Sequence, residues 1–269
     1  MPKKVVTIAG SDSLSGGGLQ ADLATFNEYG LFGLSVITSI VTFIDDQVAI
    51  HPVDVSILHE QLATTFSLGD IEGIKLGLLP CVESVEVVSQ WIQEQKSTLI
   101  VVDPVLAFKE DGKLHDLEII EAMKGLLFPF ADIITPNLLE AEIFSGMKIR
   151  SMSDMEEVAK KLFQCGSKAV VIKGGTRLSG NTAVDLFFDG EHTQIFKLPK
   201  LSQNMNNGAG CTFASAILAG KLSGMDNLSS IEQAKRFVYE GILHGIFVNE
   251  TYGNVWQAAD RYEGGNYEK

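Results

Sequence analysis

A run of small residues in the last third of the 269-residue chain has the composition of a phosphate-binding turn. Residues 206–217 read NNGAGCTFASAI, so Gly208, Ala209 and Gly210 open an alanine-rich stretch that we expect to be helical. The first backbone N–H groups of a helix lack intrahelical acceptors and lie at the positive end of its dipole, which suits an anion. We therefore expect the amides of residues 208–211 to bind a phosphate group.

Cys211 lies in the same turn. At a helix start we expect the pKa of its thiol to be lowered, which favours the nucleophilic thiolate. A cysteine also fits a close-packed helix start as a small buried apolar side chain. The sequence leaves both interpretations open.

A glycine-rich segment follows the first apolar run. Residues 10–22 read GSDSLSGGGLQAD, and three consecutive glycines allow a backbone to approach a ligand closely. The segment contains neither G-x-G-x-x-G nor Gly-Lys-Ser/Thr, so it is not a dinucleotide fingerprint or a Walker A motif. Asp12 and Asp22 are suited to hydrogen-bond a polar ligand, although Asp22 equally suits the dipole of a first helical turn. A ligand-binding loop and a plain strand-to-helix turn both remain possible.

Lys173 ends an apolar run and is followed by Gly174 and Gly175. We expect a lysine at the end of a buried strand to reach into a crevice, where phosphate is its natural partner. A surface lysine is the alternative. Asp185, on the next predicted strand, is expected to face the same crevice.

Other polar residues also follow predicted strands. Asp103 ends the run 99–102 and is held by Pro104. Asn137 and Glu140 have the N-cap and N3 spacing of a capping box. The alternative is that this amide and carboxylate face a Mg²⁺-nucleotide, since Mg²⁺ prefers oxygen ligands.

Strand-length apolar runs alternate with helical patterns along most of the chain, which predicts an α/β fold. The predicted strands, apolar on both faces, are residues 5–9, 34–43, 71–76, 99–102, 133–134 and 169–172. The predicted helices are residues 19–29, 55–66, 82–95, 116–127, 154–165, 209–222 and 231–248. Residues 184–188 and 193–198, joined by Asp189-Gly190, predict an antiparallel hairpin. Beyond Tyr252 we expect a loosely held, polar terminus.

We therefore expect one domain over residues 1–269, with a mostly parallel central sheet, flanking helices and a small antiparallel addition. Such sheets bind ligands beyond the carboxyl ends of their strands.

Composition disfavours several classes of function. With 21 basic and 34 acidic residues the net charge is −13, which disfavours binding to nucleic acid or to an anionic membrane. The longest apolar runs have strand length, and the first residues do not resemble a signal peptide. The three cysteines are far apart in sequence, which favours neither a disulfide framework nor a zinc site and fits a reduced cytoplasmic setting.

The motifs occur in the order found in the ribokinase superfamily. AGSDSLSGGGLQAD, VDPV, TPNLLEAE, VIKGG and GAGCTFASAI resemble the branch that contains hydroxymethylpyrimidine/phosphomethylpyrimidine kinases and the pyridoxal kinases similar to them. The resemblance covers about residues 4–250. It implies a ribokinase-like fold, ATP-dependent phosphorylation of a hydroxymethyl group on a small heteroaromatic ring, Mg²⁺ and a homodimer.

The resemblance also implies roles for individual residues. The implied catalytic set is Cys211, Lys173, Gly208, Ala209 and Gly210. The implied ATP-binding residues are Asn137, Glu140, Lys173, Gly174, Gly175, Asp185 and Gly210. The implied substrate-binding residues are Asp12, Gly18, Asp22, Phe43, Leu78, Val105 and Cys211. Asn137, Glu140 and Asp103 are implied to hold Mg²⁺ through water, and residues 108–114 to form a lid.

The choice of substrate depends on position 43. Pyrimidine kinases of this branch typically carry a glutamine there that reads the aminopyrimidine, whereas the B6 kinases carry methionine. Phe43 cannot make those hydrogen bonds, which favours pyridoxal kinase over hydroxymethylpyrimidine kinase. A non-catalytic relative that binds a vitamer or a nucleotide is the alternative from another class.

The chain departs from the pattern in three places. Phe108 stands where B6 kinases of the branch often have a second cysteine, so a mechanism that needs two thiols is in doubt. Asn207 replaces a common histidine before the GAGC motif. Leu14-Ser15 replaces the usual Ser/Pro-Gly in the first loop, which bears on the substrate loop.

Overall fold

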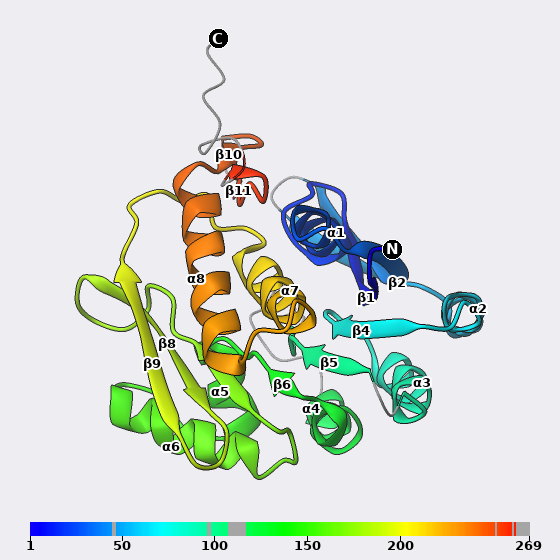
Figure 1. Cartoon of the computed structure of the whole chain (residues 1–269), viewed down its shortest axis with the longest axis horizontal. Helices are drawn as coiled ribbons and strands as arrows, with labels where there is room; N and C mark the ends of the chain where they lie inside the picture. Colours follow the sequence, from blue (N-terminus) through cyan, green and yellow to red (C-terminus); the bar gives the residue numbers. More distant parts are fainter. Residues whose placement is uncertain (45–46, 96–97, 107–116, 251, 260, 262–269) are drawn as a thin grey trace.

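The computed structural model describes residues 1–44, 47–95, 98–106, 117–250, 252–259 and 261. Its centre is a nine-stranded sheet in the order β3-β2-β1-β4-β5-β6-β7-β8-β9 (Figure 1). The strands are β1 Lys4–Asp12, β2 Phe32–Ile44, β3 Gln47–Pro52, β4 Ile71–Leu76, β5 Leu99–Val102, β6 Ile133–Ile134, β7 Val170–Lys173, β8 Thr182–Phe188 and β9 Thr193–Pro199. A separate antiparallel pair joins β10 Ile246–Phe247 to β11 Gly253–Asn254.

Six neighbouring strands, from β2 to β7 in the sheet, pair in parallel. The edges are antiparallel, with β3 beside β2 at one end and the β8–β9 hairpin beside β7 at the other. The predicted mostly parallel sheet with an antiparallel addition is therefore confirmed. The second antiparallel edge, β3, was not predicted, because its exposed residues carry too little apolar alternation to indicate a strand.

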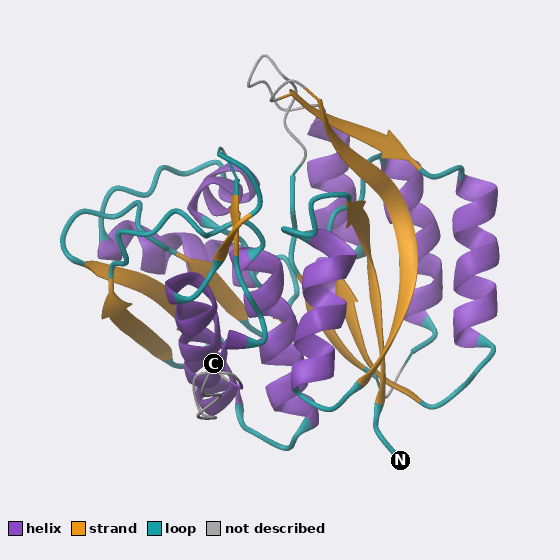
Figure 2. Cartoon of the chain, turned by 90° about the horizontal axis from the view of Figure 1, so that it is seen from above, coloured by secondary structure: helices purple, strands orange, loops and turns teal. Residues whose placement is uncertain are grey.

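Helices cover both faces of the sheet (Figure 2). They are α1 Gly18–Glu28, α2 Val55–Phe66, α3 Val82–Gln93, α4 Leu117–Leu126, α5 Leu138–Ser145, α6 Met152–Phe163, α7 Ala209–Leu222 and α8 Asn227–Leu243. One apolar cluster packs α2 to α6 against the sheet, and the other packs α1, α7 and α8 against its opposite face. Neighbouring strand residues alternate between the two clusters, as Val101 and Val102 do, which explains why the parallel strands are apolar throughout.

The C-terminal third differs from the prediction in two places. The last helix begins at Asn227, capped by the Asp226 carboxylate, and ends at Leu243 rather than at residue 248. The chain beyond Tyr252 is docked rather than loose as far as it is described, because Val255 and Ala259 are buried. The described helices include none that is long and apolar enough to cross a lipid bilayer.

The parallel arrangement brings several chain segments to one edge of the sheet. The glycine-rich loop follows β1, Asp103 follows β5, Asn137 lies just beyond β6, and Lys173 ends β7. All four lie at or just beyond the carboxyl ends of parallel strands, where the candidate site is built.

Candidate active site

The turn that begins α7 has the backbone of an anion-binding turn. Gly208 is the N-cap with a φ of 83°, and no side chain among the described residues caps the turn. The first intrahelical bond runs from the Thr212 amide to the Gly208 carbonyl at 2.8 Å, so the amides of Gly210 and Cys211 precede it. The amide of Ala209 donates to the Asn206 carbonyl at 3.1 Å, so one of the four expected amides is engaged within the chain.

Gly208 is required by space as well as by its positive φ. A Cβ built on Gly208 would lie 1.6 Å from the carbonyl oxygen of Gly16. The glycine-rich loop is therefore packed directly against the start of α7, and no side chain fits between them.

Asp12 shapes that loop from within. One carboxylate oxygen accepts the Leu14 amide and the other accepts the Gly17 amide, both at 2.8 Å. Asp12 therefore helps to fold the loop, and its implied role in substrate binding stays a prediction. Gly18, with a φ of 58°, donates its amide to the Cys211 sulfur at 3.4 Å, which joins α1 to α7.

The environment of Cys211 contradicts the expected low pKa. Burial is the main cause that raises the pKa of the Cys211 thiol to about 11; the charge of Lys75 opposes the rise, and the carboxylates of Asp22 and Asp103 contribute to it. The loss of hydration raises the pKa of Cys211 by more than the helix start lowers it, so Cys211 is a thiol at neutral pH in the ligand-free protein.

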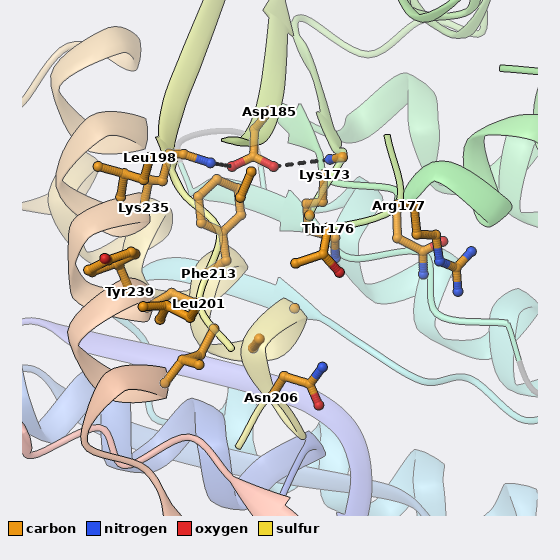
Figure 3. A pocket seen from close by; sticks show the side chains of 18 of the residues that line it. Lys173, Thr176, Arg177, Asp185, Leu198, Leu201, Asn206, Phe213, Lys235 and Tyr239 are labelled. Atoms are coloured by element: carbon orange, nitrogen blue, oxygen red, sulfur yellow. Dashed lines mark hydrogen bonds and ion pairs between the residues drawn. The ribbon is translucent and has the colours of Figure 1, made fainter. Parts of the chain in front are cut away.

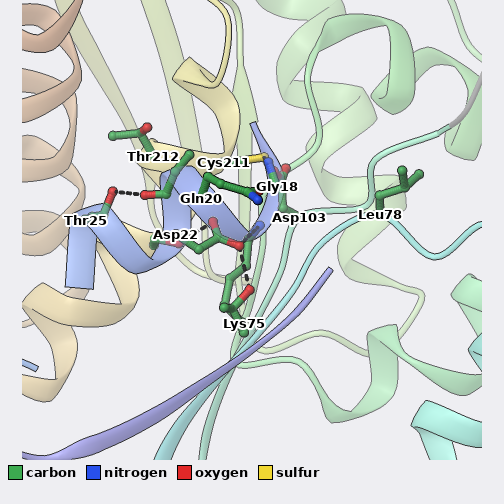
Figure 4. Close-up of polar contacts among 12 residues, drawn as sticks. Gly18, Gln20, Asp22, Thr25, Lys75, Leu78, Asp103, Cys211 and Thr212 are labelled. Carbon is green, nitrogen blue, oxygen red and sulfur yellow. Dashed lines mark hydrogen bonds and ion pairs between the residues drawn. The ribbon is translucent and has the colours of Figure 1, made fainter. Parts of the chain in front are cut away.

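Asp22 is fully buried and does not present a free oxygen to a substrate (Figure 4). One oxygen accepts Thr7 Oγ1 at 2.6 Å and Lys75 Nζ at 2.8 Å, and the other accepts Ser215 Oγ at 2.8 Å. These contacts assign Asp22 a structural role, and its implied role as a substrate ligand stays a prediction. Asp22 ties α1 to β1, β4 and α7, because its three hydrogen-bond donors come from those elements.

Lys75 was missed from the sequence. It is fully buried on β4, and although burial opposes its charge, the Asp22 carboxylate raises its pKa above the usual value. The available signal was a lysine inside the run IEGIKL, which forms a strand expected to be buried on both faces.

Lys173 and Asp103 form an ion pair opposite the α7 turn. Lys173 Nζ lies 2.5 Å from Asp103 Oδ1, which also accepts Thr135 Oγ1 at 3.2 Å. A Cβ built on Gly210 would lie 3.0 Å from Lys173 Nζ, so the ammonium is next to the helix start. Here the structure brings together the cation and the backbone amides that the sequence suggested separately.

Asn137 and Glu140 form the capping box that was one of their two interpretations. The Asn137 side chain accepts the Glu140 amide at 3.0 Å, and the Glu140 carboxylate accepts the Asn137 amide at 2.8 Å. Burial raises the pKa of Glu140 to about 7; Lys173 lowers it and Asp103 raises it, so this carboxyl also senses the ion pair.

Asp103, Asn137 and Glu140 offer oxygen atoms that suit Mg²⁺. Asp103 Oδ2 is buried, has no hydrogen-bond partner among the described residues and lies 3.9 Å from a Cβ built on Gly210. The described part of the chain contains no cluster of three or more His, Cys, Asp or Glu side chains able to hold a metal ion. Mg²⁺ suits such a place because it binds through one or two carboxylates and keeps waters and phosphate oxygens as its other ligands.

A cavity of about 420 Å³ opens beside the ion pair (Figure 3). The residues of the expected ATP and phosphate sites that line it are Asn137, Lys173, Gly174, Gly175, Asp185, Ala209 and Gly210. Its far side is apolar, with Leu201, Phe213 and Tyr239, whereas Arg177 lies on the side of Lys173. The cavity thus offers a cationic end and an apolar end, as a nucleotide requires.

Asp185 holds the wall of this cavity. One oxygen accepts the Gly174 amide at 3.0 Å and the other pairs with Lys235 Nζ at 2.6 Å. Lys235 comes from α8 and was not singled out from the sequence, because a lysine in an amphipathic helix normally faces water.

Of the remaining residues implied for the substrate ring, Phe43 lies on β2, Leu78 lies beside Gly10, and Val105 follows β5. Phe43 packs edge-on against Tyr252, with ring centroids 5.2 Å apart. Leu78 Cδ2 lies 3.2 Å from a Cβ built on Gly10, and Val105 donates its amide to the Asp103 carbonyl at 2.8 Å. The expected lid, residues 108–114, and the departure at Phe108 lie outside the described residues.

Comparison with known proteins gives consistent matches along the chain. It is 37% identical over 248 residues to the hydroxymethylpyrimidine/phosphomethylpyrimidine kinase of Aquifex aeolicus, covering 92% of this chain and 97% of that protein. It is 36% identical over 262 residues to the pyridoxine kinase of Bacillus subtilis, covering 96% and 97% of the two chains.

A solved structure matches as well. The ADP complex of Bacillus subtilis pyridoxal kinase superposes with a TM-score of 0.93 at 35% identity, covering 97% of this chain and 99% of that chain. The family model described as phosphomethylpyrimidine kinase matches residues 12–256. The chain therefore belongs to the phosphomethylpyrimidine kinase family.

Proposed function

We propose that this protein is an ATP-dependent pyridoxal kinase, which transfers the γ-phosphate to the 5′-hydroxymethyl group of pyridoxal, pyridoxine or pyridoxamine. The observation that carries the proposal is the placement of Lys173 Nζ beside Gly210, at the open start of α7. Kinase relatives of both the pyridoxine and the pyrimidine type support the reaction class. The protein would act in salvage of vitamin B6.

ATP would occupy the 420 Å³ cavity. The apolar wall of Leu201, Phe213 and Tyr239 suits a base, and Lys173 with Gly174 and Gly175 suits the phosphates. The ADP bound to the Bacillus subtilis pyridoxal kinase supports a nucleotide for this chain too.

The corner formed by Asp103, Asn137 and Glu140 would hold Mg²⁺ through water, and the unpartnered Asp103 Oδ2 supports that assignment. When bound, the ion would neutralise charge on the phosphate oxygens of ATP.

Phosphoryl transfer depends mainly on positioning and on neutralising charge. Lys173 would neutralise the transferring phosphoryl group from one side, while the amides of Gly210 and Cys211 would stabilise its oxygens from the other. The acceptor hydroxymethyl group would lie beside Cys211, with the heteroaromatic ring towards Phe43, Leu78 and Val105.

The thiol form of Cys211 bears on its role. With a pKa of about 11, about one Cys211 in ten thousand is ionised at pH 7, so its use as base or as covalent anchor for an aldehyde needs a bound ligand to favour the thiolate. We propose that Cys211 chiefly shapes the anion-binding turn, through its contact with the Gly18 amide.

Hydroxymethylpyrimidine kinase is the second candidate, favoured by the Aquifex aeolicus relative. Against it stands Phe43, whose ring packs on Tyr252 and offers no hydrogen bond to an aminopyrimidine.

The exposed apolar side chains of Phe32, Ile40 and Ile44 on β2 suit a homodimer, which we propose together with a cytoplasmic location.

One assay tests the proposal. ATP consumption is measured with pyridoxal, pyridoxine and hydroxymethylpyrimidine side by side. We expect the highest kcat/KM with a B6 vitamer. Preference for the pyrimidine would select the second candidate, and turnover with none of the three rings would indicate a non-catalytic binding relative.

A further inference from the structure

The described end of the chain runs alongside the start of α7. We call residues 253–257 the C-terminal strap. The Asn207 amide donates to the Gly253 carbonyl and the Val255 amide donates to the Asn207 carbonyl, both at 3.1 Å. Asn207 immediately precedes the N-cap Gly208, so the strap fixes the residue from which the anion-binding turn starts.

The strap also reaches into the first turn of α7. Gln257 Nε2 donates to Thr212 Oγ1 at 3.0 Å, and both side chains are buried. Thr212 follows Cys211 directly and supplies the first intrahelical amide of α7. The two residues that flank the phosphate-binding amides, Asn207 and Thr212, are thus both held by the strap.

Asn254 connects the strap to the glycine-rich loop. Its side chain is buried, and its Nδ2 donates to the Leu14 carbonyl at 2.8 Å. Its Oδ1 is buried, finds no hydrogen-bond partner in the part of the chain that the structure describes, and lies 3.0 Å from a Cβ built on Gly16. Gly16 is the residue whose carbonyl meets Gly208, so Asn254 supports the loop where it contacts α7.

The strap itself has a firm anchor on α8. The Trp256 amide donates to the Gly241 carbonyl at 2.9 Å, and a Cβ built on Gly241 would lie 2.7 Å from Val255 Cγ1. The contact is close enough to exclude a side chain at Gly241. The strap therefore links α8 to the glycine-rich loop and to the first turn of α7.

We propose that Asn254 and Gln257 are positioning residues, which hold the glycine-rich loop and the first turn of α7 in register for phosphoryl transfer. This rests on the proposed function. The reason is geometric, since a displacement of about 1 Å at a reacting group can cost about 100-fold in rate. Burial of the Asn254 side-chain amide with an unsatisfied oxygen also costs free energy, which argues that the hydrogen bond donated by its Nδ2 has a specific role.

The test compares Asn254→Ala and Gln257→Leu with the control Val158→Ala. Val158 is fully buried on α6, in the apolar cluster on the opposite face of the sheet, so its truncation lowers stability without touching the strap. We expect each strap variant to lower kcat by about 10- to 100-fold while the KM values for ATP and the vitamer change less than about threefold. Val158→Ala should keep its kcat at an equal or larger loss of Tm.

A second measurement needs no activity. Alkylation of Cys211 by iodoacetamide, followed by peptide mass mapping to separate it from Cys81 and Cys165, should accelerate in both strap variants and not in Val158→Ala. The reason is that a displaced loop no longer covers the thiol with the Gly18 amide.

Wild-type kcat and unchanged alkylation in both strap variants would overturn the proposal, as would parallel losses in Val158→Ala. If one strap variant fails to fold, the other decides. A wild-type protein without kinase activity refutes the proposed function alone, because the alkylation result still shows whether the strap sets the geometry of the turn.

Discussion

The ammonium of Lys173 and the carboxylate of Asp103 meet at 2.5 Å beyond the carboxyl ends of β7 and β5. The pair is nearly closed to solvent, with side-chain exposures of 13% and 1%. It faces Gly210 at the start of α7, so a cation, a carboxylate oxygen and backbone amides surround one point. A transferring phosphoryl group placed there would meet positive charge from two sides.

Replacing Lys173 should affect the rate more than binding. We expect Lys173→Met to lower kcat by about 100- to 1000-fold, since it removes a donor aimed at developing charge. Steady-state kinetics with varied ATP separates kcat from KM. The control is Lys168→Met, whose exposed side chain pairs with Asp132 away from the cavity. An unchanged turnover number in Lys173→Met would remove this lysine from the mechanism.

Gly208 should tolerate no side chain. Gly208→Ala combines a positive φ with a Cβ 1.6 Å from the Gly16 carbonyl, so the loop and α7 must separate. We expect a loss of more than about 2 kcal/mol in the free energy of unfolding together with loss of most activity.

Gly224→Ala is the matched control for that experiment. Its φ of 91° imposes a similar backbone penalty, but no described atom beyond its chain neighbours lies within 4 Å of the added Cβ. We expect it to cost about 1 kcal/mol and to retain activity, as measured by urea unfolding and the kinase assay. Equal effects of the two substitutions would show that the contact with Gly16 is unimportant.

The features that the sequence predicts are those that depend on local patterns of residues. The fold class, the parallel strands and the β8–β9 hairpin follow from runs of apolar residues, because periodicity reports burial directly. The spacing of Asn137 and Glu140 likewise predicts their capping box. Those features are local in sequence and need no knowledge of distant contacts.

The missed features all depend on distant contacts. Lys75 meets Asp22 across 53 positions, and Asn254 meets Leu14 across 240. The pKa of Cys211 was predicted in the wrong direction because the helix start is visible in the sequence, whereas its burial is not. The docking of the C-terminal strap was not predicted for the same reason. Its polar residues suggest a loose terminus, because their hydrogen-bond partners are distant in the sequence.

The rate of Cys211 alkylation should depend on pH as expected for a thiol with a raised pKa. Burial raises this pKa to about 11, so the rate with iodoacetamide should rise about tenfold per pH unit between about pH 7 and 10 in the native protein. The unfolded protein, with thiol pKa values of about 8.5, serves as the control and should level off near pH 9. A native profile that levels off below pH 8 would contradict the raised pKa of Cys211.

The raised pKa of Cys211 also makes the free energy of unfolding depend on pH. Because the folded state holds the Cys211 proton more tightly than the unfolded state, its contribution to the free energy of unfolding is present below about pH 9 and lost as the pH rises towards 11. Cys211→Ala should lose less stability than the wild type over that interval, as measured by urea unfolding.

The buried Asp22–Lys75 pair should show strong coupling. Lys75→Met leaves the Asp22 carboxylate uncompensated at zero exposure, and we expect a loss of about 3–5 kcal/mol in the free energy of unfolding. Asp22→Asn should be similarly harmful. The double variant should recover part of the loss, because neither charge is then left buried alone. Additive losses in the urea unfolding cycle would mean that the two groups do not stabilise each other.

Position 43 should control the choice between the two ring systems. Phe43→Gln introduces an amide that can pair with an aminopyrimidine, while it removes the ring that packs on Tyr252. We expect kcat/KM for hydroxymethylpyrimidine to rise relative to pyridoxal by about 10-fold or more, since a hydrogen bond made in a desolvated site discriminates strongly. Phe43→Leu is the control, because it loses the aromatic contact without gaining a hydrogen bond. A similar shift in both variants would assign the effect to the loss of the ring, and no shift in Phe43→Gln would place the heteroaromatic ring away from β2.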